Sequence, residues 1–207
     1  MSAVDSLISS FRDAAVADTD SASTPDVGII MGSDSDLPVM RGAHDALVEL
    51  GFSEATAEDP DPTGRFSFES FVVSAHRTPD LMYAYAETAA DRGLEVIIAG
   101  AGGKSADLPN MTASIAYPVP VIGVPVQEKS VDSVIGMPTG APIVAVDAGK
   151  SFNAGLSAAQ MLAVGHPELR NRLVAYQESL VEDVVAASRR LHAEGTESYL
   201  ARTDNRN

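Results

Sequence analysis

Three polar side chains, Ser74, His76 and Arg77, close an apolar run in the stretch VVSAHRTPD at residues 72–80. An imidazole accepts and donates a proton near neutral pH, and a guanidinium binds a phosphate through two parallel hydrogen bonds. The Thr-Pro-Asp segment that follows is explained as a helix start, with threonine as its N-cap. That role does not explain the histidine or the arginine. We therefore predict proton transfer and phosphate binding here, against the alternative that His76 is a packing residue.

The segment GSDSD, residues 32–36, is a second candidate site, because it follows another apolar run and leads into a helical pattern. Gly32 permits a tight turn, and the hydroxyls of Ser33 and Ser35 stand beside free helix N-terminal amides, which suits a phosphate. Asp36 is predicted to be the helix N-cap. If a nucleotide binds here, an aspartate fits its ribose hydroxyls better, because a carboxylate repels phosphate.

A third candidate segment, AGAGG at residues 99–103, has no side chain large enough to keep a flat ligand away from its backbone. The alternative is that its glycines only form a turn. The next segment, KSADLPNM, offers Lys104 and Asp107 as polar contacts.

The elements that must position these segments are apolar runs of strand length at residues 27–32, 71–75, 95–103, 119–126 and 142–149. They are apolar at consecutive positions, which is typical of parallel strands buried on both faces. Helical patterns lie near residues 37–50, 79–92, 106–115 and 151–164, and residues 59–70 are predicted to be a turn-rich loop. This alternation predicts an open α/β fold with a parallel sheet, in which ligands bind at the carboxyl ends of the strands.

We predict three parts along the chain. Residues 1–25 are a mobile N-terminal arm rich in Asp, Ser and Thr, with a short amphipathic helix, and residues 26–165 are the α/β catalytic domain. Residues 166–207 contain a helix from Pro167 to about Ala193, followed by a tail. The apolar positions of this helix predict packing on the domain or on a neighbouring subunit.

The charge balance excludes several classes of partner. The chain has 29 acidic and 14 basic residues, a formal net charge of -15 and only three lysines. A field of this sign repels nucleic acid and anionic membranes. It suits solvation in concentrated salt, so we predict a halophilic protein, against the alternative of an ordinary acidic one. No membrane span and no secretory signal is recognisable, which favours the cytoplasm.

Cofactor motifs are missing from the sequence. It has no cysteine, no G-x-G-x-x-G fingerprint and no G-x-x-x-x-G-K-[ST] loop, and its histidines at 44, 76, 166 and 192 lack the spacing of metal ligands. We therefore expect the chemistry to use protein groups alone, with neither a metal nor an organic cofactor.

Taken in order, the segments GIIMGSDSD, VVSAHRTPD, VIIAGAGG, LPNM, VPVIGVPV, MPTG and NAGLSAAQML resemble the class I PurE family of N5-carboxyaminoimidazole ribonucleotide mutases. The resemblance covers about two thirds of the chain, from Val27 to Ala163. It implies a flavodoxin-like three-layer sandwich, usually assembled as an octamer, without a cofactor. It also implies that a carboxylate moves from N5 of the substrate to ring carbon C4, through decarboxylation and recapture of carbon dioxide. A separate ATP-dependent carboxyaminoimidazole ribonucleotide synthetase would supply the substrate.

The resemblance also implies roles for single residues. Ser33, Ser74 and Arg77 match positions that hold the phosphate, and Asp36 matches the position that binds the ribose. His76 matches the histidine that carries a proton between the nitrogen losing the carboxylate and the carbon gaining it.

The backbone of Ala101, Gly102 and Gly103 is implied to line the pocket of the aminoimidazole and its carboxylate. The next segment departs from the family pattern, since GGKSADLPNM stands where the family usually reads GGAAHLPGM. Asp107 lies near the place of a histidine. We retain Asp107 and Leu108 as candidate substrate-binding residues at the border of the pocket.

Four other functions compete with the mutase. A related class II type carboxylates aminoimidazole ribonucleotide directly, but that class resembles SAHKxP and GRSNG more closely than the segments seen here. A third enzyme with PurE-like domains carboxylates a pyridinium mononucleotide. A phospho-acceptor receiver module would use Asp34, Asp36 and Lys150, yet AGAGG lacks the aspartate that such a module phosphorylates. An inactive homologue is the last alternative, and the altered segment around Asp107 supports it.

Overall fold

The computed structural model describes residues 2–17 and 24–204. Within these residues, six strands form one parallel sheet in the order β2-β3-β1-β4-β5-β6. The strands are β1 (Val27–Met31), β2 (Ser53–Ala55), β3 (Ser67–Val72), β4 (Val96–Ala101), β5 (Val121–Pro125) and β6 (Val144–Ala145). Every residue of β1, β4 and β5 is buried, as their continuous apolar runs require. The predicted α/β sandwich with a central parallel sheet is confirmed.

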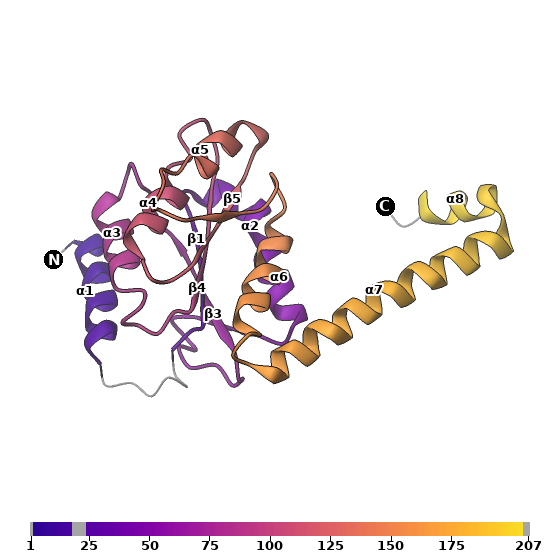
Figure 1. Cartoon of the computed structure of the whole chain (residues 1–207), viewed down its shortest axis with the longest axis horizontal. Coiled ribbons are helices and arrows are strands. Elements are labelled where there is room, and N and C mark those ends of the chain that lie inside the picture. Colours follow the sequence, from indigo (N-terminus) through magenta and orange to yellow (C-terminus); the bar gives the residue numbers. More distant parts are fainter. Residues whose placement is uncertain (1, 18–23, 205–207) are drawn as a thin grey trace.

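Helices cover both faces of the sheet (Figure 1). One face carries α2 (Leu37–Glu49) and α6 (Ser151–Leu162), and the other carries α1 (Ala3–Val16), α3 (Pro79–Glu87), α4 (Leu108–Ile115) and α5 (Val131–Ile135). Helices α2 and α6 approach closely at Gly155, where an added Cβ would lie 2.7 Å from the carbonyl oxygen of Ala43. Glycine at this position therefore sets the spacing of the two helices.

Strands β2, β3 and β6 differ from the prediction. Strand β3 begins at Ser67, inside the loop expected at 59–70. Its start was missed because its residues form no continuous apolar run and only Phe68 among them is fully buried. Strand β2 has only three half-buried residues and was not predicted. The run at 142–149 contributes only the two residues of β6. Strands β2 and β6 form the two edges of the sheet, and β3 lies between β2 and β1 with one fully buried residue, so the apolar signal of all three is weak.

Helix α1 packs against α3 on the outer face of the sandwich. Its Phe11 is 4% exposed and stands edge to face with Phe71 and Tyr85, at centroid distances of 5.0 and 5.2 Å. The predicted N-terminal arm therefore includes a helix with one core residue. Residues 18–23 of that arm lie outside the described residues, and the three-part division of the chain stays a prediction.

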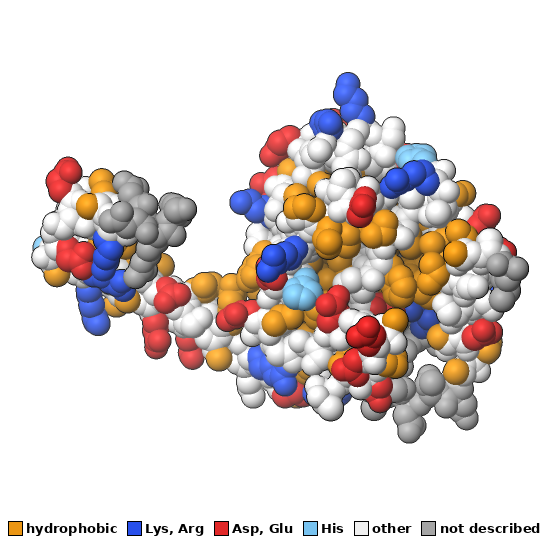
Figure 2. Space-filling view, turned by 180° about the vertical axis from the view of Figure 1, so that it is seen from behind, with side chains coloured by type: hydrophobic (Ala, Val, Ile, Leu, Met, Phe, Trp, Pro, Cys, Tyr) orange, Lys and Arg blue, Asp and Glu red, His pale blue; other side chains and the backbone are white. Residues whose placement is uncertain are grey.

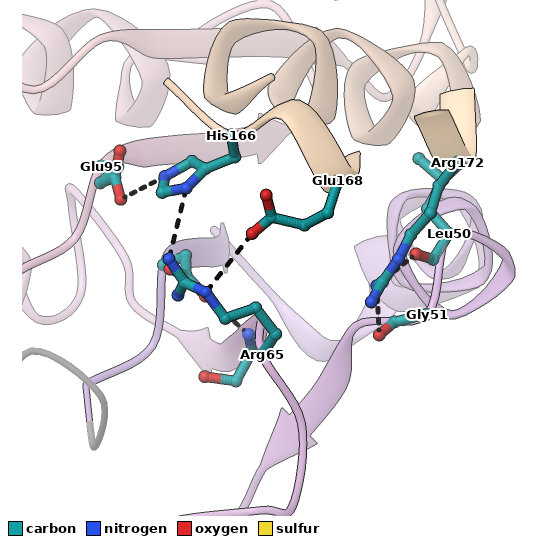
Figure 3. Close-up of polar contacts among 9 residues, drawn as sticks. Leu50, Gly51, Arg65, Glu95, His166, Glu168 and Arg172 are labelled. Atoms are coloured by element: carbon teal, nitrogen blue, oxygen red, sulfur yellow. Dashed lines mark hydrogen bonds and ion pairs between the residues drawn. The ribbon is translucent and has the colours of Figure 1, made fainter. Parts of the chain in front are cut away.

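The predicted C-terminal helix is confirmed as α7 (Pro167–Glu194), which runs out from the body of the molecule to the short helix α8 (Thr196–Asp204) (Figure 1). Polar contacts fix its base (Figure 3). Arg172 donates to the carbonyl oxygens of Leu50 and Gly51, at 3.0 and 3.1 Å, and Glu168 lies 3.4 Å from Arg65. Neither α7 nor any other described helix combines the length and the apolar content that crossing a membrane requires.

Candidate functional site

The candidate site is a cleft of about 520 Å³ at the carboxyl ends of β1, β3 and β4. The strand register places Met31 beside Val72 on one side and Gly100 on the other, so the three segments after these strands meet at one edge of the sheet. The structure brings all ten predicted site residues to this cleft, namely Ser33, Asp36, Ser74, His76, Arg77, Ala101, Gly102, Gly103, Asp107 and Leu108.

Arg77 is oriented by the turns that follow β1 and β3. Its Nη2 donates to the carbonyl oxygen of Gly32 at 2.8 Å, and its backbone amide donates to Ser74 Oγ at 3.2 Å. Thr78 stands at the N-cap position of α3 but makes no side-chain cap, so the predicted capping role was wrong. Its hydroxyl instead accepts from the Ser74 amide at 3.0 Å and donates to the Ser74 carbonyl at 3.3 Å. These bonds hold Ser74 at the cleft.

The turn after β1 gathers hydroxyl groups at the start of the short 3-10 helix η2 (Asp34–Asp36). Ser35 donates through its amide and its hydroxyl to Ser33 Oγ, at 3.3 and 3.0 Å, and Ser33 Oγ donates to Asp34 Oδ1 at 3.0 Å. The hydroxyls of Ser33 and Ser35 therefore lie together at one end of the cleft. Each hydroxyl hydrogen is held within the turn, so these hydroxyls would have to rotate to donate to an anionic group of a ligand.

Asp36 is 8% exposed and stands at the N-cap position of α2, yet its side chain makes no cap hydrogen bond. The predicted capping role was therefore wrong. Its backbone is α-helical rather than extended, which does not suit an N-cap side chain. A Cβ added at Gly102 would lie 3.1 Å from Asp36 Oδ1, so glycine there leaves room for the carboxylate. Burial raises the pKa of Asp36, against the lowering effects of the Ser33 backbone and Arg77.

His76 lines the cleft and contacts Asp107. Its Nε2 is 2.9 Å from Asp107 Oδ2, and the two side chains are 61% and 43% exposed. Ser133 Oγ, from α5, donates to the other carboxylate oxygen of Asp107 at 3.4 Å. A group that can carry a proton thus lies open to the cleft beside a fixed carboxylate.

The end of β4 forms the floor of the cleft. Gly103 has φ of 86°, which favours glycine, and its carbonyl oxygen accepts a hydrogen bond from Ser130 Oγ at 2.8 Å. With only Ala101, Gly102 and Gly103 on this floor, a flat ring can approach the backbone.

Gly32 and Ser35, which were predicted as parts of the phosphate-binding turn, also line the cleft, whereas four further lining residues were missed, namely Ala75, Ser105, Gln127 and Lys129. Gln127 and Lys129 follow β5, and Lys129 lies in the 3-10 helix η3 (Glu128–Ser130). Their place after a predicted strand was the signal that could have found them.

Lys129 and Arg77 supply positive charge to the cleft, and Asp36 and Asp107 supply hydrogen-bond acceptors. Among the described residues, no group of three or more His, Cys, Asp and Glu side chains could hold a metal ion.

Comparison with known proteins places this fold and cleft in a family. The family model described as AIRC, AIR carboxylase, matches residues 26–183. This chain belongs to the AIR carboxylase family. An N5-carboxyaminoimidazole ribonucleotide mutase of Thermotoga maritima is 43% identical over 182 residues, which cover 85% of this chain and 97% of that protein. The protein of the same name from Mycobacterium tuberculosis is 49% identical over 175 residues, covering 82% of this chain and 91% of that protein.

Solved structures agree with the AIR carboxylase assignment at the level of the fold. The crystal structure of Treponema denticola PurE superposes with a TM-score of 0.65 and 23% sequence identity, over 80% of this chain and 97% of that chain. The family match ends at residue 183, inside α7, and begins after α1. Helix α1 and the distal part of α7 are therefore outside the region that the family model describes.

Proposed function

We propose that this protein converts N5-carboxyaminoimidazole ribonucleotide to its C4-carboxylated isomer in de novo purine biosynthesis. One observation carries the proposal: a single cleft is lined by His76, Ser33, Asp36, Ser74 and Arg77. The chain that forms this cleft is 43% identical to a mutase over 85% of its length. Ser33, Ser74 and Arg77 would hold the phosphate, because they offer hydroxyl and guanidinium donors. Asp36 would accept from the ribose hydroxyls, and the β4 floor would carry the aminoimidazole.

His76 would carry the proton of the reaction. When the bond between N5 and the carboxylate breaks, its electron pair stays on nitrogen and takes a proton from the imidazolium. The C4 carbon then attacks the released carbon dioxide, and the C4 proton returns to the imidazole, so that no proton is gained or lost overall. A closed cleft favours this recapture, because carbon dioxide held beside C4 reacts without a bimolecular encounter.

We further propose that the protein is a homo-oligomer, an octamer by its resemblance to the family, and that it acts after the ATP-dependent synthetase in the cytoplasm. Exposed apolar side chains on α7 support the oligomer. Figure 2 shows hydrophobic groups along the helix where it leaves the body. The exposed apolar side chains of α7 include Leu180, Val181, Val184, Val185 and Leu191, from its middle outward. A second copy of the chain would cover them.

A paired assay tests the mutase proposal. In concentrated potassium chloride, the formation of the C4-carboxylated ribonucleotide is followed from the N5-carbamate and, separately, from the uncarboxylated ribonucleotide with bicarbonate. Turnover of the carbamate alone is the expected result. Efficient turnover with bicarbonate would instead assign the chain to the direct carboxylases, a class that the name of the family model also covers. No turnover of either substrate would support an inactive homologue.

A further inference from the structure

Asp107 stands at the N-cap position of α4 but does not cap it. A capping aspartate typically stabilises a helix by about 1 kcal/mol, which Asp107 forgoes. Its carboxylate instead binds two groups from other elements, namely His76 Nε2 at 2.9 Å and Ser133 Oγ at 3.4 Å. The first contact spans 31 residues and the second spans 26 residues of the chain. Tertiary contacts therefore fix the position of this carboxylate.

Ser133 is itself held in place from α4. Asn110 Nδ2 donates to the carbonyl oxygen of Ser133, while the hydroxyl of Ser133 donates to Asp107. Asn110 and Asp107 thus bind the same residue of α5 from the first turn of α4. The result is a series of hydrogen bonds that runs from Asn110 through Ser133 and Asp107 to His76, which we call the Asp107 network.

Folding stability does not account for the contact of His76 with Asp107. The two side chains are 61% and 43% exposed, and exposed ion pairs contribute little to the free energy of unfolding. The contact does constrain the imidazole. An ionised carboxylate only accepts hydrogen bonds, so Nε2 must carry a hydrogen, and the neutral ring then has its lone pair on Nδ1. In the part of the chain that the structure describes, no hydrogen bond to His76 Nδ1 is present.

We propose that Asp107 is a positioning residue, which holds His76 in the Nε2–H tautomer and leaves Nδ1 to exchange the proton with the substrate. The role assigned to Nδ1 rests on the proposed function. The tautomer itself does not, because it follows from the geometry of the substrate-free protein. Asp107 would thus act through His76 rather than as the substrate-binding residue predicted from the sequence.

The tautomer can be measured without any substrate. In protein labelled with ¹⁵N at histidine, long-range ¹H–¹⁵N spectra at a pH where the rings are neutral separate the two tautomers, and the His76 signals are those lost in His76→Asn. We expect the Nε2–H pattern in the wild type. In Asp107→Ala the two ¹⁵N shifts of His76 should move toward each other, because the ring then samples both tautomers. Unchanged His76 signals in this variant would overturn the proposal.

The chain supplies a matched control for this experiment. His44 Nδ1 lies 3.1 Å from Asp45 Oδ1 on α2, in another exposed pair of histidine and aspartate. Asp45→Asn should change the signals of His44 and leave those of His76 and the turnover unchanged. Asp107→Asn serves as a second variant if Asp107→Ala does not fold, since its shape matches that of aspartate.

Kinetics then separate positioning from substrate binding. For Asp107→Ala we expect kcat to fall roughly 10- to 100-fold with little change in KM, as a misplaced catalytic group produces. Ser133→Ala, which keeps the carbonyl oxygen that binds Asn110, should lower kcat in the same direction by less. A higher KM with unchanged kcat would make Asp107 a substrate contact and overturn the proposal. If neither substrate turns over in the wild type, the proposed function fails while the spectra still decide the tautomer.

Discussion

At the scale of single residues, two aspartates show how the site competes with local helix stability. Asp36 and Asp107 both occupy N-cap positions with helical backbone angles, and neither makes a cap hydrogen bond. Each carboxylate instead lies at the cleft. Asp107 gives up a capping bond for contacts with His76 and Ser133, which function explains better than folding does.

The buried carboxylate of Asp36 gives a prediction on stability. Burial raises the pKa of Asp36, so the folded state favours the protonated carboxyl group. The stability that this protonated form contributes is lost as the pH rises through the raised pKa. Asp36→Asn should therefore be more stable than the wild type at neutral pH. The difference should shrink as the pH falls toward about 4, where aspartate is protonated in the unfolded chain. Urea unfolding over this pH range measures it.

The same substitution should weaken substrate binding. Hydrogen bonds to a charged group contribute about 1.5–3 kcal/mol, so KM should rise roughly 10- to 100-fold in Asp36→Asn. Asp45→Asn, on the exposed side of the same helix, is the control and should alter neither stability nor KM appreciably. The gain in the free energy of unfolding of Asp36→Asn over the wild type should be larger at neutral pH than at low pH. A smaller gain at neutral pH would contradict the role of burial.

Much of the site could be predicted at this scale, because the carboxyl ends of adjacent parallel strands must meet. The ten predicted residues line one cleft for that reason. The capping roles predicted for Thr78 and Asp36 were wrong, because the Thr78 hydroxyl bonds to the backbone of Ser74 and the Asp36 carboxylate lies at the cleft. The contact of Ser133 with Asp107 joins two helices whose approach no local pattern encodes.

At the scale of elements, α1 is a structural addition whose packing can be tested through Phe11. The guanidinium of Arg92, which pairs with Glu69 at 2.7 Å, lies 4.9 Å from the centre of the Phe11 ring. Phe11→Ala should lower the free energy of unfolding by about 3 kcal/mol, through a cavity and the exposure of this ion pair. Turnover per folded molecule should not change, because α1 does not line the cleft.

Leu7→Ala provides the control for this prediction, because Leu7 is on the same helix and exposed. It should change the free energy of unfolding by no more than about 0.5 kcal/mol. Equal effects of the two substitutions in denaturant unfolding would show that α1 does not dock through Phe11 in solution.

The central elements were predictable because they are buried on both faces, whereas β3 was partly missed for a physical reason. It carries Phe68 to one core and Phe71 to the other, while Glu69 reaches the buried Arg92. A strand that alternates apolar residues with a buried salt-bridge partner resembles a polar loop in sequence.

At the scale of the whole molecule, a net charge of -15 predicts dependence on salt. Self-repulsion of the folded state falls as salt screens it, and most of this screening is complete below about 1 M. For a halophilic protein, the free energy of unfolding should continue to rise with potassium chloride above this concentration. A plateau reached well below 1 M would instead indicate an ordinary acidic protein.

The α7 helix gives a prediction on assembly. Val184 is 69% exposed in the apolar stripe, whereas Ala186 lies on the opposite face of the helix. Val184→Asp should reduce the assembled state in sedimentation velocity, because it places a charge in the surface that a second copy would cover. Ala186→Asp adds the same charge and should assemble like the wild type. Equal assembly of both variants would exclude this face of α7 as a contact between copies.

The central claim is that His76 transfers the proton in the carboxylate shift, and the conversion of the N5-carbamate by His76→Asn tests it most directly. The account predicts a loss of kcat of at least about 100-fold, with product binding by calorimetry close to that of the wild type. Asparagine is smaller and keeps a polar group near the place of Nδ1, but it cannot carry a proton at neutral pH. Turnover close to the wild-type rate in this variant would contradict the account.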